Sequence, residues 1–187
     1  MVLGGGGSRR MGRPKADLID ATGRPLMATA LHRLWPWARV RVVAGQGPGQ
    51  RPPPWVPWLR DPPGLCGPLA GVAAAVQAFP ADYYLVLALD LPRARPDLLV
   101  DAGRRHPDRA VVGRTAEGAW QPLAGLYPAE HARGALRLLR RGQRRAISWA
   151  LSGPRVPFAV PGPWWVNVNT PEEAARLLGP PYREPAP

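Results

Sequence analysis

The chain contains few of the residues and segments on which several protein classes depend. It has one cysteine, Cys66, among 187 residues, which excludes an intramolecular disulfide and a cysteine-based zinc site. No apolar run reaches the roughly 18 residues that a membrane-spanning helix needs. The N-terminus also lacks the basic segment followed by an apolar segment that is typical of a signal peptide. These absences predict a soluble, cytoplasmic protein that does not contact a membrane.

Acidic residues and lysine are also scarce. Thirteen Asp and Glu side chains stand against 25 Lys and Arg, which gives a net charge of +12, and Lys15 is the single lysine. Such a balance is compatible with nucleic-acid binding. However, the excess of Arg over Lys is typical of a GC-rich genome, and the basic residues are spread along the chain. We therefore expect no nucleic-acid partner.

One dense basic run lies at residues 133–145, where spacings of three and four place most of its members on one helix face. Its members are Arg133, Arg137, Arg140, Arg141, Arg144 and Arg145. A solvated helix face is the simplest interpretation. The alternatives are an anionic substrate or an acidic partner protein of the same pathway.

The order of apolar runs predicts the fold class. Strands are expected at 1–3, 40–44, 55–59, 83–89, 110–112, 123–127 and 164–168. Helices are expected at 25–35, 67–78, 96–105, 130–141 and after Thr170, where Glu173 completes a capping box. This alternation predicts an α/β fold with a mostly parallel sheet and helices on both faces. We expect one domain over 1–178 and a loose, Pro-rich tail over 179–187.

The first strand is followed directly by a glycine-rich, basic segment, Leu3-Gly4-Gly5-Gly6-Gly7-Ser8-Arg9-Arg10-Met11-Gly12-Arg13-Pro14-Lys15. Glycines let backbone amides approach anionic oxygens, and Arg10 and Lys15 supply charge to a polyphosphate. Neither a Walker A motif nor the G-x-G-x-x-G dinucleotide fingerprint fits this spacing. A flexible linker is the remaining alternative to a phosphate-binding loop.

Polar residues follow other strands. Asp90 comes directly after the apolar run 83–89, where ligands of open α/β sheets bind, and a carboxylate there can hold Mg²⁺ together with phosphates. Asp61 ends the third strand in the same way. The alternative for each Asp is a turn former before proline, and this alternative is stronger for Asp61 than for Asp90. Asn167 and Asn169 alternate in the last expected strand, so both can address one pocket.

Taken together, the segments LGGGGSRRMGRPK, GPLAGV, LDLP, QPLAGLY and VNVNTPEEA occur in an order that resembles the molybdenum cofactor guanylyltransferase (MobA) family. The resemblance runs from Leu3 to about Leu178. It implies a three-layer Rossmann-like nucleotidyltransferase fold. It also implies an Mg²⁺-dependent transfer of GMP from GTP to molybdopterin, with release of pyrophosphate.

The resemblance also implies a role for each matching residue. The backbone of Leu3, Gly4 and Gly5 would cradle GTP, and Lys15 would contact its phosphates. The remaining implied roles are the nucleotide contact for Asp61, Mg²⁺ and nucleotide for Asp90, neutralisation of pyrophosphate for Arg10, and the molybdopterin side for Asn167 and Asn169.

Two residues depart from the family pattern. Gly4 stands where the family has alanine, and Ala44 stands where the family often has an asparagine that contacts the nucleotide. A backbone group or Gln46 is then needed for that contact. Three alternatives stay open: a cytidylyltransferase of the same fold, an inactive nucleotide-binding paralogue, and a basic nucleic-acid-binding domain. The last would need aromatic residues on a sheet face, whereas Trp35, Trp37, Trp55 and Trp58 occur near prolines and are expected to pack in loops and core.

Overall fold

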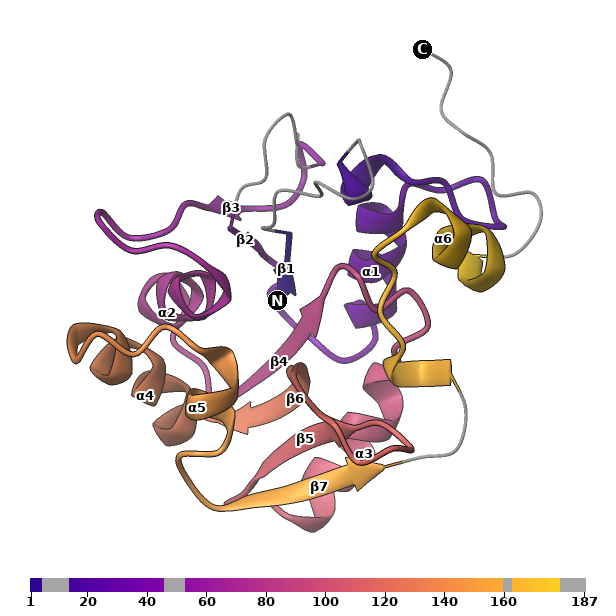
Figure 1. The fold of residues 1–187 in the computed structure, drawn as a ribbon. Coiled ribbons are helices and arrows are strands. Elements are labelled where there is room, and N and C mark those ends of the chain that lie inside the picture. The colour runs from indigo at the N-terminus through magenta and orange to yellow at the C-terminus, as the bar shows by residue number, and fades with distance from the viewer. Residues whose placement is uncertain (5–13, 46–52, 160–162, 179–187) are drawn as a thin grey trace.

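A computed structural model describes residues 1–4, 14–45, 53–159 and 163–178 (Figure 1). Within these residues seven strands form one sheet in the order β3-β2-β1-β4-β6-β5-β7. The strands are β1 (Val2–Leu3), β2 (Val43–Ala44), β3 (Trp58–Leu59), β4 (Tyr83–Ala88), β5 (Ala110–Arg114), β6 (Trp120–Pro128) and β7 (Arg155–Ala159). All neighbours pair in parallel except those of β6, which is antiparallel to both β4 and β5. The predicted mostly parallel sheet is confirmed.

Helices cover both faces of this sheet, as expected. They are α1 (Leu26–Leu34), α2 (Pro68–Ala78), α3 (Pro96–Arg105), α4 (Ala129–Arg140), α5 (Ala146–Ala150) and α6 (Pro171–Leu178). Figure 1 shows α2, α4 and α5 on one face and α1, α3 and α6 on the other. Because side chains alternate along a strand, β4 contributes side chains to the core on both faces of the sheet. Leu85 and Leu87 pack with α1 and α3, while Tyr84 and Val86 pack with α2 and α4.

Small residues bring α2 unusually close to the sheet. A Cβ atom on Gly71 would stand 3.1 Å from Leu3 Cδ2 and 3.3 Å from the Ala44 Cβ. The side chain of residue 44 therefore faces α2. The sequence GPLAGV serves a close helix–sheet contact in this half of the sheet.

The prediction for the last strand was wrong. Residues 164–168 do not join the sheet; a short 3₁₀ helix, Pro163–Trp165, leads into irregular chain that reaches α6. Two apolar residues of this segment, Trp165 and Val168, are nevertheless buried, because they pack in the core with α1 and α6, whereas Val166 is exposed. The seventh strand is β7, an edge strand whose alternating exposure carries too little apolar signal to stand out in the sequence.

Other differences concern lengths. β2 and β3 have two residues each, shorter than the expected 40–44 and 55–59. β3 is an edge strand of the sheet, as Pro57 next to it predicts. None of the described helices is both long enough and apolar enough to cross a membrane. The tail 179–187 lies outside the described residues.

Candidate active site

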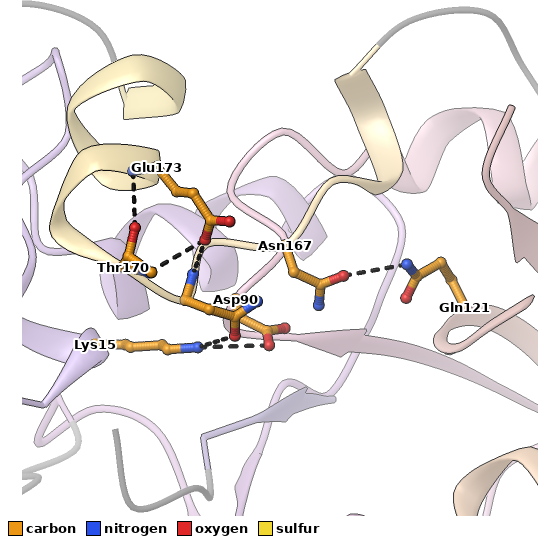
Figure 2. A network of polar contacts seen from close by, with 7 residues as sticks. Lys15, Asp90, Gln121, Asn167, Thr170 and Glu173 are labelled. Carbon is orange, nitrogen blue, oxygen red and sulfur yellow. Dashed lines mark hydrogen bonds and ion pairs between the residues drawn. The ribbon is translucent and has the colours of Figure 1, made fainter. Parts of the chain in front are cut away.

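The candidate site lies along the carboxyl ends of the parallel strands, at the side of the sheet where the antiparallel strand β6 begins. Gly4 follows β1, Asp90 follows β4 after one residue, and Gln121 lies at the start of antiparallel β6. The irregular segment before α6 crosses these strand ends, since the Val168 amide donates to the Asp90 carbonyl at 2.8 Å. Segments from four parts of the chain therefore meet there (Figure 2).

Lys15 is the centre of the polar contacts. Its ammonium donates to Asn169 Oδ1 at 2.9 Å and lies 3.6 Å from Asp90 Oδ2. The side chain is 15% exposed and that of Asp90 26%, so the pair is partly shielded from water. The sequence assigned these three residues separately to one site, and the structure brings them together.

Asp90 keeps one carboxylate oxygen available. Its Oδ1 is buried and accepts no hydrogen bond from the residues that the structure describes, while Oδ2 faces Lys15. No group of three or more His, Cys, Asp or Glu side chains that could hold a metal occurs within the described residues. A site with a single protein carboxylate suits Mg²⁺, which retains water and uses substrate phosphates as further ligands. The buried, unpartnered oxygen is consistent with such an ion.

The predicted capping box at the start of α6 holds the backbone of Asn169. Glu173 Oε2 accepts hydrogen bonds from the amides of Asn169 at 2.6 Å and Thr170 at 3.1 Å, and Thr170 Oγ1 accepts one from the Glu173 amide at 3.2 Å. The capping box is thus confirmed. The sequence assigned Glu173 only to the helix start, whereas it also holds the backbone of the residue that contacts Lys15.

Asn167 lies beside this group but has a different partner. Its Oδ1 accepts a hydrogen bond from Gln121 Nε2 at 3.1 Å, and the same Nε2 donates to the Trp165 carbonyl at 3.1 Å. Asn167 and Asn169 do not alternate on a strand, so that part of the argument was wrong. Figure 2 shows Asn167 turned toward Gln121.

Asp61 occupies a separate place. Its Oδ2 accepts a hydrogen bond from the Gly67 amide at 3.3 Å just before α2, and its Oδ1 is buried and has no partner among the described residues. Burial raises the pKa of Asp61 above its ordinary value, and the hydrogen bond from Gly67 opposes this. β3 and β4 are three strand spacings apart in the sheet, about 14 Å. Asp61 and Asp90 therefore lie at two different places along the row of strand ends, one after β3 and the other after β4.

The phosphate-loop residues are only partly described. Leu3 is a buried strand residue, and the Gly4 amide donates to the Ala44 carbonyl at 3.0 Å. The Gly4 amide is therefore engaged in the sheet and is not free to bind a phosphate. Gly5, Arg10 and Gln46 lie outside the described residues.

Several other residues prove to be structural or solvent-facing. Trp35 and Trp55 are 59% and 56% exposed, so the expectation that they pack in loops and core was wrong for them. His131 makes an edge-to-face contact with Trp149 in the layer of α4 and α5, with the ring centres 5.7 Å apart. The six arginines of the 133–145 run are all exposed, as a solvated face requires.

Comparison with known proteins agrees with this geometry. A family model described as the MobA-like NTP transferase domain matches residues 1–154. Molybdenum cofactor guanylyltransferase of Pseudomonas aeruginosa is 33% identical over 183 residues, covering 92% of this chain and 90% of the relative.

Solved structures share the fold at lower identity. Molybdopterin-guanine dinucleotide biosynthesis protein A of Archaeoglobus fulgidus has a TM-score of 0.74 at 22% identity, covering 94% of each chain. The 2-C-methyl-D-erythritol 4-phosphate cytidylyltransferase of Thermus thermophilus has a TM-score of 0.67 at 19% identity, covering 92% of this chain and 93% of that one. Because the family model matches residues 1–154 and the Pseudomonas aeruginosa relative is 33% identical over most of both chains, the chain belongs to the MobA-like NTP transferase domain family.

Proposed function

We propose that the protein transfers GMP from GTP to molybdopterin and releases pyrophosphate. The observation that carries this proposal is the position of Lys15, whose ammonium is held between Asp90 and Asn169 at the carboxyl edge of the sheet. The name and 33% identity of the Pseudomonas aeruginosa relative support the choice of substrates.

The reaction requires attack by a phosphate oxygen of molybdopterin on the α-phosphorus of GTP. The new O–P bond forms as the bond to the β-phosphate breaks, and pyrophosphate leaves with the electron pair. A phosphate nucleophile is already ionised near neutral pH, so no general base is needed. The protein's task is to bring two polyanions together in line and to offset the charge that develops on the leaving group.

Each site residue has a part in this task. Lys15 is a point charge for the GTP phosphates, and Arg10, in the glycine-rich segment, is assigned to the leaving pyrophosphate. The backbone of Leu3, Gly4 and Gly5 is assigned to the nucleotide cradle, although the amide of Gly4 is already used in the sheet.

Asp90 is the residue assigned to Mg²⁺, through its unpartnered Oδ1. When bound, the ion supplies charge neutralisation on the phosphate oxygens. Lys15, 3.6 Å from Oδ2, holds the carboxylate in its orientation and shares its negative charge.

The two substrates are assigned to opposite ends of this row of strand ends. Asp61, beside the start of α2, is assigned to the nucleoside part of GTP. Asn167 and Asn169 are assigned to the molybdopterin side, where Gln121 and Glu173 fix their positions. In this arrangement the α-phosphorus lies between the two ends, next to Lys15 and Asp90.

A second candidate is a cytidylyltransferase acting on molybdopterin. The observation that favours it is Ala44, which is fully buried against α2 and offers no polar side chain to a base. The cytidylyltransferase of Thermus thermophilus has the same fold, so the fold itself does not select the base.

Pyrophosphate release from GTP and from CTP, each with Mg²⁺ and molybdopterin, tests both candidates. Release from GTP alone supports the guanylyltransferase, and release from CTP alone replaces it with the cytidylyltransferase. Binding of GTP without release from either nucleotide would identify an inactive paralogue. Omitting Mg²⁺, or replacing it with Ca²⁺, tests the metal requirement in the same assay.

A further inference from the structure

A cavity of about 540 Å³ opens beside α1 and the start of α3, on the face of the sheet that α6 also covers. This volume lies within the range of small-molecule sites. Its chemically distinctive lining residues are Arg33, Arg93, Arg95, Asp97, Trp37 and Trp164. None of Lys15, Asp90, Asn167 and Asn169 lines it, so the cavity is separate from the candidate active site.

The cavity holds more positive than negative charge. The Arg33 guanidinium donates to the Pro92 carbonyl, and the pKa of Arg33 is lowered by burial and by Arg93, while Asp20 opposes the shift. Arg93 donates through Nε to the Leu177 carbonyl at 2.8 Å. Within the described part of the chain no carboxylate forms an ion pair with Arg93, so its charge is not offset there.

The aromatic residues give the cavity flat surfaces. The Arg95 guanidinium lies 5.4 Å from the centre of the Trp164 ring, and it is held by Asp97 through hydrogen bonds from Nε at 2.9 Å and Nη2 at 2.5 Å. Trp37 is 36% exposed beside them. Indole faces and fixed guanidinium planes are surfaces on which planar rings stack.

We propose that this cavity is a second ligand site, which takes a planar heterocycle carrying an anionic group. The arginines supply the charge for the anion, and the tryptophans supply the stacking surface for the ring. A guanine nucleotide and a pterin with an acidic side group share this chemistry. The segments 90–97 and 164–169 contribute to both this cavity and the active-site edge, so a ligand here lies behind the catalytic residues.

Fluorine NMR of the whole chain labelled with 5-fluorotryptophan tests the proposal without any turnover. The signals of Trp37 and Trp164 are assigned from their loss in Trp37→Phe and Trp164→Phe. The probes are GMP, pterin-6-carboxylate and inorganic phosphate. We expect GMP, the pterin or both to shift these two signals saturably. The signal of Trp149, which is fully buried in the opposite layer, should stay in place.

Variants locate the binding. Arg93→Gln with Arg95→Gln should raise the half-saturating probe concentration at least about tenfold, whereas Arg133→Gln with Arg137→Gln removes equal charge from exposed positions on α4 and should leave it unchanged. If the first pair lowers thermal stability, Trp37→Ala at its partly exposed position replaces it.

Three outcomes would overturn the proposal. The first is the absence of any selective shift with either ring compound. The second is an equal shift with phosphate alone, which would mean a simple anion site. The third is loss of the shifts in Lys15→Met with Asp90→Asn, which would place the ligand in the catalytic edge. Because the readout does not depend on catalysis, an inactive protein could still pass this test.

Discussion

The two halves of the sheet are built differently, and the candidate active site lies where they join. β1, β2 and β3 have two residues each, whereas β4 to β7 have between five and nine. In the short-stranded half the chain leaves the sheet after only two residues of each strand. In the long-stranded half, extended ladders and large buried side chains such as Trp149 dominate.

Under the proposed function, this difference would separate nucleotide binding from stability. The small residues Gly71 and Ala44 let α2 approach the short-stranded half of the sheet closely, but residues of this size bury little apolar surface. The long strands supply the rigid support. Lys15 comes from the first half and Asp90 from the end of β4 in the second, so their contact connects the two.

The largest effect is expected for Asp90→Asn, which removes one carboxylate charge at that junction without changing side-chain size. Turnover should fall about 10²–10³-fold, because an amide is a poor Mg²⁺ ligand and cannot balance Lys15. Pyrophosphate release at saturating Mg²⁺ measures this, alongside a thermal melt.

The control for this variant is Asp101→Asn, the same change on the half-exposed surface of α3, which should leave turnover unaffected. Near-normal activity of Asp90→Asn at saturating Mg²⁺ would remove the metal role from this residue.

The next largest effect concerns stability in the long-stranded half. A Cβ on Gly125 would stand 2.7 Å from Tyr127 Cε2 and 2.8 Å from the Val111 carbonyl oxygen, so backbone must move. Gly125→Ala should lower the free energy of unfolding by about 3 kcal/mol. Urea denaturation measures it.

Gly71→Ala is the matched change in the short-stranded half. Its Cβ meets the end of the Leu3 side chain and the Ala44 Cβ, at 3.1 and 3.3 Å, and the helical position favours Ala by about 1 kcal/mol. We expect little change in unfolding free energy but a higher KM for GTP, because β1 and β2 are displaced. Equal destabilisation by both variants would contradict the proposed division between the halves.

The sequence predicted the architecture well where apolar signal and local rules agreed. The run YYLVLAL gave β4 to within one residue, and Thr170 with Glu173 gave the start of α6. It failed for residues 164–168, because burial of Trp165 and Val168 is satisfied without any strand pairing, which no local pattern reports.

The candidate site was predictable in part for the same reason. Asp90 and Lys15 are each next to a strong local signal, so both could be assigned before their contact was seen. The role of Gln121 in holding Asn167 depends on antiparallel β6 lying beside β4, which is a long-range pairing. The cavity around Trp164 likewise joins segments far apart in the sequence.

A smaller stability effect is expected in the connection that leads from Lys15 into α1. Asp20 Oδ1 accepts the Thr22 amide at 2.8 Å and Oδ2 accepts the Thr29 hydroxyl at 2.5 Å. Burial alone would raise the pKa of Asp20, but these hydrogen bonds outweigh it and hold the pKa below its ordinary value. Asp20→Ala should cost about 2 kcal/mol at pH 7.

The pH dependence follows from the direction of that shift. Because the folded pKa is below the unfolded value of about 3.9, the contribution of Asp20 is complete above that value and is lost as pH falls through the folded pKa. Unfolding free energies of the parent and the Asp20→Ala variant, measured from pH 7 to pH 3, should differ by a constant amount until about pH 4.5 and then converge. A difference that grows on acidification would contradict the assigned shift.

The smallest effect is expected for Lys15→Met, which keeps the length of the side chain and removes its charge. The KM for GTP should rise about tenfold, the equivalent of one charge-assisted hydrogen bond. If Lys15 contacts the phosphates equally in the ground and transition states, kcat stays the same; if it also offsets charge on the leaving group, kcat falls as well. Arg133→Met on the exposed face of α4 removes the same charge elsewhere and separates local binding from general attraction of anions. An unchanged KM in Lys15→Met would mean that the short-stranded half binds GTP through groups other than Lys15, and that Lys15 serves only to orient Asp90.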